Sequence, residues 1–120
     1  MNINLNHFNL AVSNVAESRA FLERYFKLRC ECPHYSLLIF TDVAGFVLTL
    51  MKSSDEDAVA YPESFHLGFY VDTSTVHTIH EEMRVAGIDV GEITTIRRET
   101  MFYVASPGGT LIEVCWLRAM

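Results

Sequence analysis

The stretch that decides the fold is residues 65–71, which read FHLGFYV. Side chains of a β-strand point alternately to opposite faces, so the odd-numbered positions form an apolar face and His66, Gly68 and Tyr70 share the other. A histidine on the inner side of a strand is costly to bury unless something pairs with it. We therefore expect His66 to have a specific partner.

Two other stretches repeat this pattern. Residues 5–12 read LNHFNLAV, and His7 lies opposite the apolar face of that strand. Residues 110–117 read TLIEVCWL, and Glu113 shares its face with Cys115. Two imidazoles and one carboxylate are the donor set of a facial metal triad. A shared cation would satisfy all three side chains.

The elements around these stretches are predicted to occur twice in the same order. After the strand of His7 the chain predicts a helix and three strands, over residues 14–26, 27–32, 36–41 and 46–51. After the strand of His66 it predicts the same series, over residues 73–86, 88–96, 101–105 and 110–117. Asn14, with Glu17 three positions later, is the expected cap of the first helix, and Gly87 is the expected stop of the second.

We expect an α+β fold made of two βαβββ modules that form a curved, partly open mixed sheet around a metal-site cavity. At 120 residues the chain is one domain by size. We divide it into a module over residues 1–52 and a module over residues 64–120, joined by the loop 53–63. When the halves are aligned on His7 with His66 and on Gly45 with Gly109, Thr49 falls at the position of Glu113.

Composition excludes several classes of function. A net charge of -6 gives no footprint for nucleic acid or an anionic membrane surface. The apolar runs are far shorter than the ~20 residues of a membrane span, and the amino terminus lacks signal-peptide features. The cysteines Cys30, Cys32 and Cys115 are expected to be reduced thiols, with Cys115 bordering the site. We expect a cytoplasmic protein.

The doubled pattern resembles the vicinal oxygen chelate superfamily, which includes glyoxalase I, extradiol dioxygenases, fosfomycin-resistance thiol transferases and bleomycin-binding proteins. The matching stretches are residues 5–12, 65–69 and 102–113. In the last of them, Ser106–Gly109 replaces the Asp-Pro-Asp-Gly turn of the family and keeps its turn chemistry. The resemblance implies a glyoxalase-like fold.

The resemblance also implies that His7, His66 and Glu113 bind a divalent ion of Fe, Mn, Ni, Co or Zn. Glyoxalase I enzymes carry a second glutamate at the position of Thr49, and a threonine cannot act as a base near neutral pH. The usual glyoxalase I activity is therefore disfavoured. We expect a metal-dependent lyase, dioxygenase or thiol transferase acting on a small vicinally oxygenated substrate.

Further residues are candidates for the pocket. Tyr103, ten residues before Glu113, matches a tyrosine that lines the substrate pocket of the thiol transferases, and we assign it as catalytic. Candidates for substrate binding are Asn9, Thr49, Tyr70 and Arg97. The cation-binding positions of fosfomycin enzymes are not recognisable around residues 93–100, which disfavours fosfomycin itself.

Two alternatives remain open at this point. His77 and His80 are spaced for a surface metal pair, but they lie off the apolar face of their helix and are interpreted as solvated. The protein as a whole could be a metal-free binding or sequestering protein of the bleomycin-resistance type. As partners we expect a small-molecule substrate and a second copy of the chain in a homodimer, but neither nucleic acid nor membrane.

Overall fold

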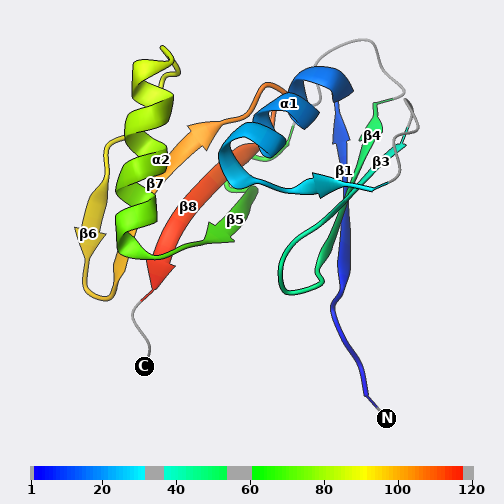
Figure 1. The fold of residues 1–120 in the computed structure, drawn as a ribbon, viewed down its shortest axis with the longest axis horizontal. Helices are drawn as coiled ribbons and strands as arrows, with labels where there is room; N and C mark the ends of the chain where they lie inside the picture. The colour runs from blue at the N-terminus through cyan, green and yellow to red at the C-terminus, as the bar shows by residue number, and fades with distance from the viewer. Residues whose placement is uncertain (1, 32–36, 54–60, 118–120) are drawn as a thin grey trace. The chain divides into compact units, whose positions relative to one another are not determined.

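The computed structural model describes residues 2–31, 37–53 and 61–117. The chain forms two compact units: unit 1 is Met1–Ala60 with Pro107–Gly109, and unit 2 is Tyr61–Ser106 with Thr110–Met120. Each unit holds a four-stranded mixed sheet and a helix in its described residues (Figure 1). The predicted α+β fold is thereby confirmed, with the order strand, helix and three strands in both halves.

The elements of unit 1 are β1 (His7–Val12), α1 (Val15–Phe26), β2 (Arg29–Cys30), β3 (Leu37–Thr41) and β4 (Val47–Lys52). Its sheet has the order β1-β4-β3-β2, in which β1 and β4 are parallel and the other neighbours antiparallel. Helix α1 begins as predicted, because the Asn14 side chain accepts a hydrogen bond from the Glu17 amide at 2.9 Å. Cys32 lies outside the described residues, and with it the pair that it would form with Cys30.

Alternation of buried and accessible residues gives the sheet of unit 1 two different faces. The buried residues of its strands and helix form one core, consisting of Leu10, Val12, Phe21, Leu22, Tyr25, Leu38, Phe40, Leu48 and Leu50. The opposite face carries His7 and Asn9, which are exposed, and Thr49, which is half-buried. We call such a face the open face of its sheet.

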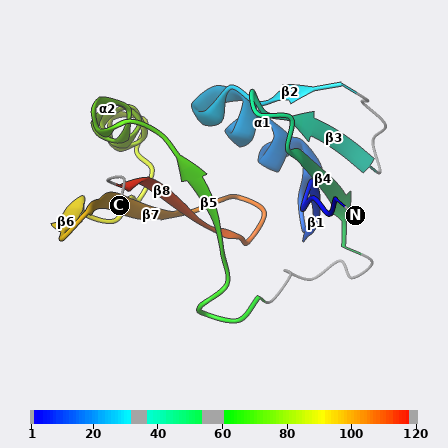
Figure 2. The ribbon, with the colours of Figure 1, turned by 90° about the horizontal axis from the view of Figure 1, so that it is seen from below.

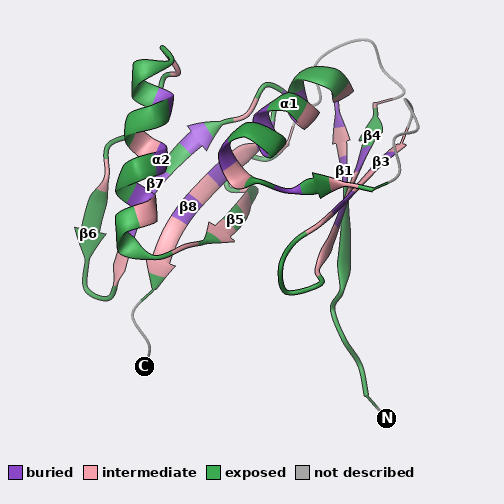
Figure 3. Cartoon of the chain, in the orientation of Figure 1, coloured by how far each residue is buried: buried purple, intermediate pink, exposed green. Residues whose placement is uncertain are grey.

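The elements of unit 2 are β5 (His66–Tyr70), α2 (Thr73–Val85), β6 (Thr94–Ile96), β7 (Glu99–Ala105) and β8 (Leu111–Leu117). The sheet has the order β5-β8-β7-β6, with β5 parallel to β8 (Figure 2). The buried side of α2 faces β7 and β8, where its core residues meet those of the sheet (Figure 3). These core residues are Val76, Ile79, Met83, Phe102, Val104, Ile112 and Val114.

Residues next to α2 in the sequence determine where the helix begins and ends. The Asp72 side chain accepts a hydrogen bond from the Thr75 amide at 2.8 Å and so caps the amino terminus. Gly87 has a φ of 81°, the left-handed conformation that ends a helix, which confirms the predicted stop. No helix in the described residues is long and apolar enough to cross a membrane.

The strand predicted over residues 88–96 is wrong for most of its length. Only Thr94–Ile96 is a strand, while Val90 forms an isolated bridge with Val104. Between them, the Gly91 amide donates to the Tyr103 carbonyl at 2.9 Å. Apolar residues at strand-like spacing were therefore not sufficient for a continuous strand.

The interpretation of His80 as a solvated helix residue is also wrong. Its Nε2 atom is 2.9 Å from the Gly91 carbonyl oxygen, which can only accept a hydrogen bond. Its ring also packs edge-on against Phe102, with the centroids 5.0 Å apart. His80 thus attaches α2 to the chain before β6 and to the core, whereas His77 is exposed.

The turn between β7 and β8 is tight and makes a close contact. The Ser106 amide donates to the Thr110 carbonyl at 2.8 Å. A Cβ atom on Gly108 would lie 2.5 Å from Ser18 Oγ and 2.8 Å from Val12 Cγ1, so no larger residue fits there without displacement. Through these contacts the turn belongs to unit 1, although both of its strands belong to unit 2.

Candidate metal centre

His66 and Glu113 come together on the open face of unit 2. His66 is the first residue of β5, and Glu113 lies on the adjacent strand β8, opposite Gly68 in the ladder. The distance between His66 Nε2 and Glu113 Oε2 is 3.1 Å. The His66 side chain is 39% exposed and the Glu113 side chain 14%, so the pair is partly removed from water.

Hydrogen bonding determines which nitrogen of His66 is free. Its Nδ1 atom is 3.1 Å from the carbonyl oxygen of Ser64, and a carbonyl can only accept, so Nδ1 carries a proton. In the neutral ring Nε2 then has a lone pair, and this lone pair faces a carboxylate oxygen of Glu113. Two acceptors at this distance require a proton or a cation between them.

Glu113 has a second neighbour that the sequence analysis missed. The side chain of Glu99, the first residue of β7, lies beside it, with their donor atoms within 4.8 Å of each other. Burial, followed by this contact and the charge of Glu99, raises the pKa of Glu113 above its usual range, against the opposing effect of His66. Glu99 has the same strand parity as Tyr103, and this parity was the signal for it.

Tyr103 and Cys115 border the same pair. Tyr103 lies opposite Glu113 in the β7–β8 ladder, and its ring packs edge-on against the His66 ring with the centroids 5.7 Å apart. Burial, together with the negative charge of Glu113 and Glu99, raises the pKa of the Tyr103 hydroxyl. The donor atoms of Glu99, Glu113 and Cys115 lie within 4.8 Å of one another, and all three residues are half-buried.

The corresponding face of unit 1 carries His7, Asn9 and Thr49. His7 Nδ1 is 2.8 Å from Asn6 Oδ1, which can only accept a hydrogen bond, so in the neutral ring Nε2 has a lone pair, as in His66. The Thr49 hydroxyl donates to Asn9 Oδ1 at 2.7 Å. These two residues are paired across β1 and β4.

The strand registers of the two units correspond. Asn9, two residues after His7, pairs with Thr49, and Gly68, two residues after His66, pairs with Glu113. The alignment of Thr49 with Glu113 therefore holds in three dimensions. At this position of the sheet, unit 1 has the hydroxyl of Thr49 and unit 2 has the carboxylate of Glu113.

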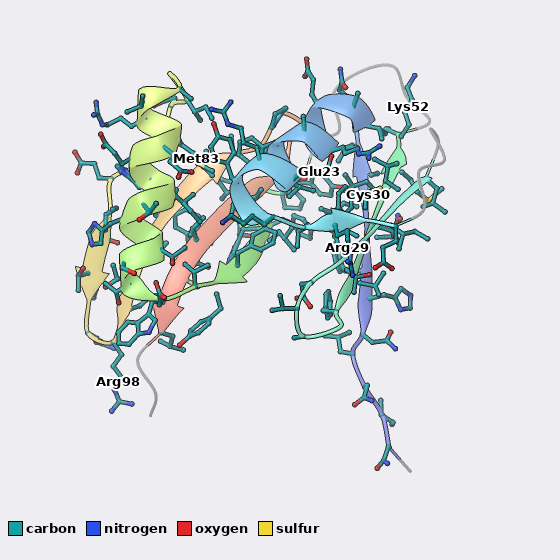
Figure 4. The ribbon with its side chains drawn as sticks, viewed as in Figure 1. Glu23, Arg29, Cys30, Lys52, Met83 and Arg98 are labelled. Atoms are coloured by element: carbon teal, nitrogen blue, oxygen red, sulfur yellow. The ribbon has the colours of Figure 1, made fainter. Side chains whose placement is uncertain are left out.

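Of the other two substrate-binding candidates, Tyr70 forms a hydrogen bond to the backbone and Arg97 lies in a turn. The Tyr70 hydroxyl donates to the Leu117 carbonyl at 3.1 Å, at the end of β8. Arg97 has a φ of 56° in the turn between β6 and β7 and is exposed. Arg98, the next residue of this turn, extends from the end of the hairpin (Figure 4).

The residues of unit 2 fit a divalent metal ion. Two ligands bound at about 2.1 Å and at right angles are about 3.0 Å apart, and His66 Nε2 and Glu113 Oε2 are 3.1 Å apart. The proton on Nδ1 held by a backbone carbonyl is also the arrangement typical of a metal-binding histidine. The pair could therefore hold such an ion without rearrangement of its donor atoms.

Comparison with known proteins gives a family. Residues 4–114 match the model of the glyoxalase/bleomycin resistance protein/dioxygenase superfamily. Among solved structures, a possible glyoxalase from Bacillus cereus is 36% identical with a TM-score of 0.85, over 94% of this chain and 98% of that one. No curated protein matches.

More distant structures share the fold. A lactoylglutathione lyase from Agrobacterium tumefaciens is 18% identical with a TM-score of 0.77, over 96% of this chain and 94% of that one. A variant of the fosfomycin resistance protein FosX from Listeria monocytogenes, complexed with Mn(II) and 1S,2S-dihydroxypropylphosphonic acid, is 20% identical with a TM-score of 0.79, over 95% and 90%. At these identities the likeness shows the fold alone. The match over residues 4–114 and the fold together establish that this chain belongs to the glyoxalase/bleomycin resistance protein/dioxygenase superfamily.

Proposed function

We propose that the protein is a divalent-metal-dependent enzyme that acts on a small substrate with two adjacent oxygen atoms. The observation that carries this proposal is the pair of His66 Nε2 and Glu113 Oε2, two acceptors 3.1 Å apart on an open sheet face. His7 is the third proposed ligand, since its Nε2 atom also has a lone pair in the neutral ring. These imidazole and carboxylate ligands suit a divalent ion of Fe, Mn, Ni, Co or Zn.

The protein residues have distinct proposed roles. When bound, the ion polarises the substrate oxygens as a Lewis acid. Tyr103, which packs against His66, is placed to contact a substrate at the ion and to hold a proton at its hydroxyl, because its pKa is raised. Asn9 and Thr49 offer polar atoms on the open face of unit 1, while Tyr70 and Arg97 are proposed as substrate contacts farther from the pair.

Relatives support the choice of substrate class. The FosX structure holds Mn(II) together with a dihydroxypropylphosphonic acid, which is a vicinal diol. By analogy we propose that the substrate of this protein binds through two neighbouring oxygens. Lyase-type, transferase-type and dioxygenase-type reactions all begin from such a complex. We also propose that the active form is a homodimer in the cytoplasm.

Elemental analysis tests the proposal against a metal-free binding protein. We expect protein purified without added metal, or soaked with Fe, Mn, Ni or Zn, to retain about one ion per site, and His66→Ala and Glu113→Ala to lose it. Empty wild-type protein under all these conditions would support the sequestering alternative instead. Oxygen uptake with catechols, set beside thiol-adduct formation with epoxides, then separates oxidative from non-oxidative reactions.

A further inference from the structure

The residues before β1 carry two exposed aliphatic side chains. Residues 2–6, which we call the arm, read NINLN, and Ile3 and Leu5 are 84% and 86% exposed. The Val47 amide, at the start of β4, donates to the Asn6 carbonyl at 2.9 Å, so the arm continues β1 past the end of β4 (Figure 1). Two aliphatic side chains at alternate positions of the arm thus lack the stabilisation that burial would give them.

The backbone of the arm also has donors and acceptors to offer. β1 is the edge strand of its sheet, and residues 2–5 form no hydrogen bond within the described part of the chain. Successive residues of a strand direct their peptide groups to opposite edges. The Asn6 carbonyl is directed to β4, so Ile3 and Leu5, of the other parity, direct theirs away from β4. The arm can therefore pair with a further strand along its outer edge.

The sequence of the arm is nearly palindromic about Asn4. Read in either direction, it alternates asparagine with an aliphatic residue, so an antiparallel copy of the arm matches it position for position. In the register centred on Asn4, Ile3 forms a hydrogen-bonded pair with the partner's Leu5, and the asparagines line the other face of the ribbon. The arm contains no charged residue that would oppose this contact, although the chain has a net charge of -6. The arm is thus complementary to itself.

We propose that the arm forms an antiparallel β-ribbon with the arm of a second copy of the chain. This inference rests on the proposed homodimer and names residues of its interface. The ribbon satisfies the outer backbone groups of the arm and removes Ile3 and Leu5 from water. A contact with two-fold symmetry closes after two copies, so it produces a dimer and not a filament. Because a standard interface has roughly 20–30 residues per partner, the short ribbon by itself gives a weak and reversible dimer.

Disulfide cross-linking tests the register. The background for this experiment carries Cys30→Ser, Cys32→Ser and Cys115→Ser. Asn4 would face the partner's Asn4 with the Cα atoms about 4.5 Å apart, a distance that a disulfide can bridge. Asn4→Cys should therefore oxidise to a covalent dimer at least tenfold faster than the control Asn2→Cys, whose two copies would lie about 13 Å apart along the ribbon. Equal rates for the two variants overturn the inference.

Sedimentation of the full-length protein over a range of concentrations tests the aliphatic contacts. We expect Ile3→Asn and Leu5→Asn each to raise the dimer Kd at least tenfold, because each change occurs twice in a symmetric dimer. Val43→Asn, which replaces a fully exposed aliphatic residue of unit 1 outside the arm, is the matched control and should sediment as wild type does. A dimeric wild type with arm variants within twofold of its Kd overturns the inference but leaves the proposed homodimer standing. A wild type that stays monomeric throughout overturns both.

Discussion

Glu113 is unfavourably placed for stability and well placed for binding a cation. Burial and the neighbouring Glu99 raise its pKa, so its ionised form costs more in the folded chain than in the unfolded chain. The sign follows from the raised pKa: its contribution to stability is full below the ordinary pKa of glutamate and is lost as the pH rises through the folded value. Such a carboxylate is retained at a cost, which is typical of a functional residue.

Replacing Glu113 should therefore separate stability from binding. At pH 8 and without metal, we expect Glu113→Gln to melt at the same temperature as wild type or higher, because glutamine carries no charge. Its affinity for Mn(II), measured by calorimetry, should fall at least tenfold. Glu82→Gln, an exposed residue of α2, is the control for both measurements. A metal-free Glu113→Gln that is clearly less stable than wild type would contradict this account.

Residue 108 must be glycine because a Cβ atom has no room there, and not because of its backbone conformation. We expect Gly108→Ala to destabilise the protein by about 1–3 kcal/mol, because its Cβ would lie 2.5 Å from Ser18 Oγ. Gly68→Ala is the matched control, since the nearest atom to its Cβ is Glu113 Oε2 at 4.0 Å, an ordinary contact. Chemical denaturation of the three proteins measures the difference. Equal decreases in the free energy of unfolding in both variants would show that the close approach at Gly108 does not destabilise Gly108→Ala.

Strand parity predicted part of the site at the level of residues. Alternation is a local property, so it placed His66 and Glu113 correctly on the open face before any pairing was known. It missed Glu99 because the predicted strand began at Met101, whereas β7 begins at Glu99. The convergence of the two glutamates depends on cross-strand register, which no single stretch of sequence contains.

At the level of elements, the ends of the helices were the most predictable features. A cap involves residues three positions apart, so Asn14 and Gly87 carried their signals within the local sequence. Within residues 88–93, the Ile88 amide donates to the Met83 carbonyl, and Gly91 forms hydrogen bonds with His80 and Tyr103 in place of a continuous strand ladder. Local periodicity cannot anticipate such partners.

His80 gives a direct test of how α2 is attached. We expect His80→Ala to lower the free energy of unfolding by about 1–2 kcal/mol, because it loses a hydrogen bond to Gly91 and an edge-on contact with Phe102. His77→Ala, on the same helix but exposed, should stay within about 0.5 kcal/mol of wild type. If both variants behave alike, His80 does not attach the helix.

The cap of α2 predicts a dependence on pH. Hydrogen bonds from Thr75 and Ser74 lower the pKa of Asp72 below its ordinary value. A lowered pKa means that the stabilisation is present above the ordinary value and is lost as the pH falls through the folded value. Asp72→Asn keeps the cap without the charge, so wild type should melt higher than Asp72→Asn at pH 7, and the gap should close towards pH 3. A gap that is constant with pH would contradict this prediction.

At the level of the whole molecule, the proposed ligands come from both units. We expect Mn(II) at about a hundredfold excess over its Kd to stabilise the wild type by about 2.7 kcal/mol. Hydrogen exchange should then slow around His7 in unit 1 and around Glu113 in unit 2. In His7→Ala the slowing should be confined to unit 2. Slowing confined to unit 2 in the wild type as well would remove His7 from the ligand set.

The Pro107–Gly109 turn has a consequence for how the protein is made. Residue 108 is synthesised 90 residues after Ser18 and 96 residues after Val12, the two residues that it contacts. This contact therefore forms only after residue 108 has left the ribosome. Truncation of the message before the codon for residue 108 should consequently leave an amino-terminal product that is a substrate for proteases.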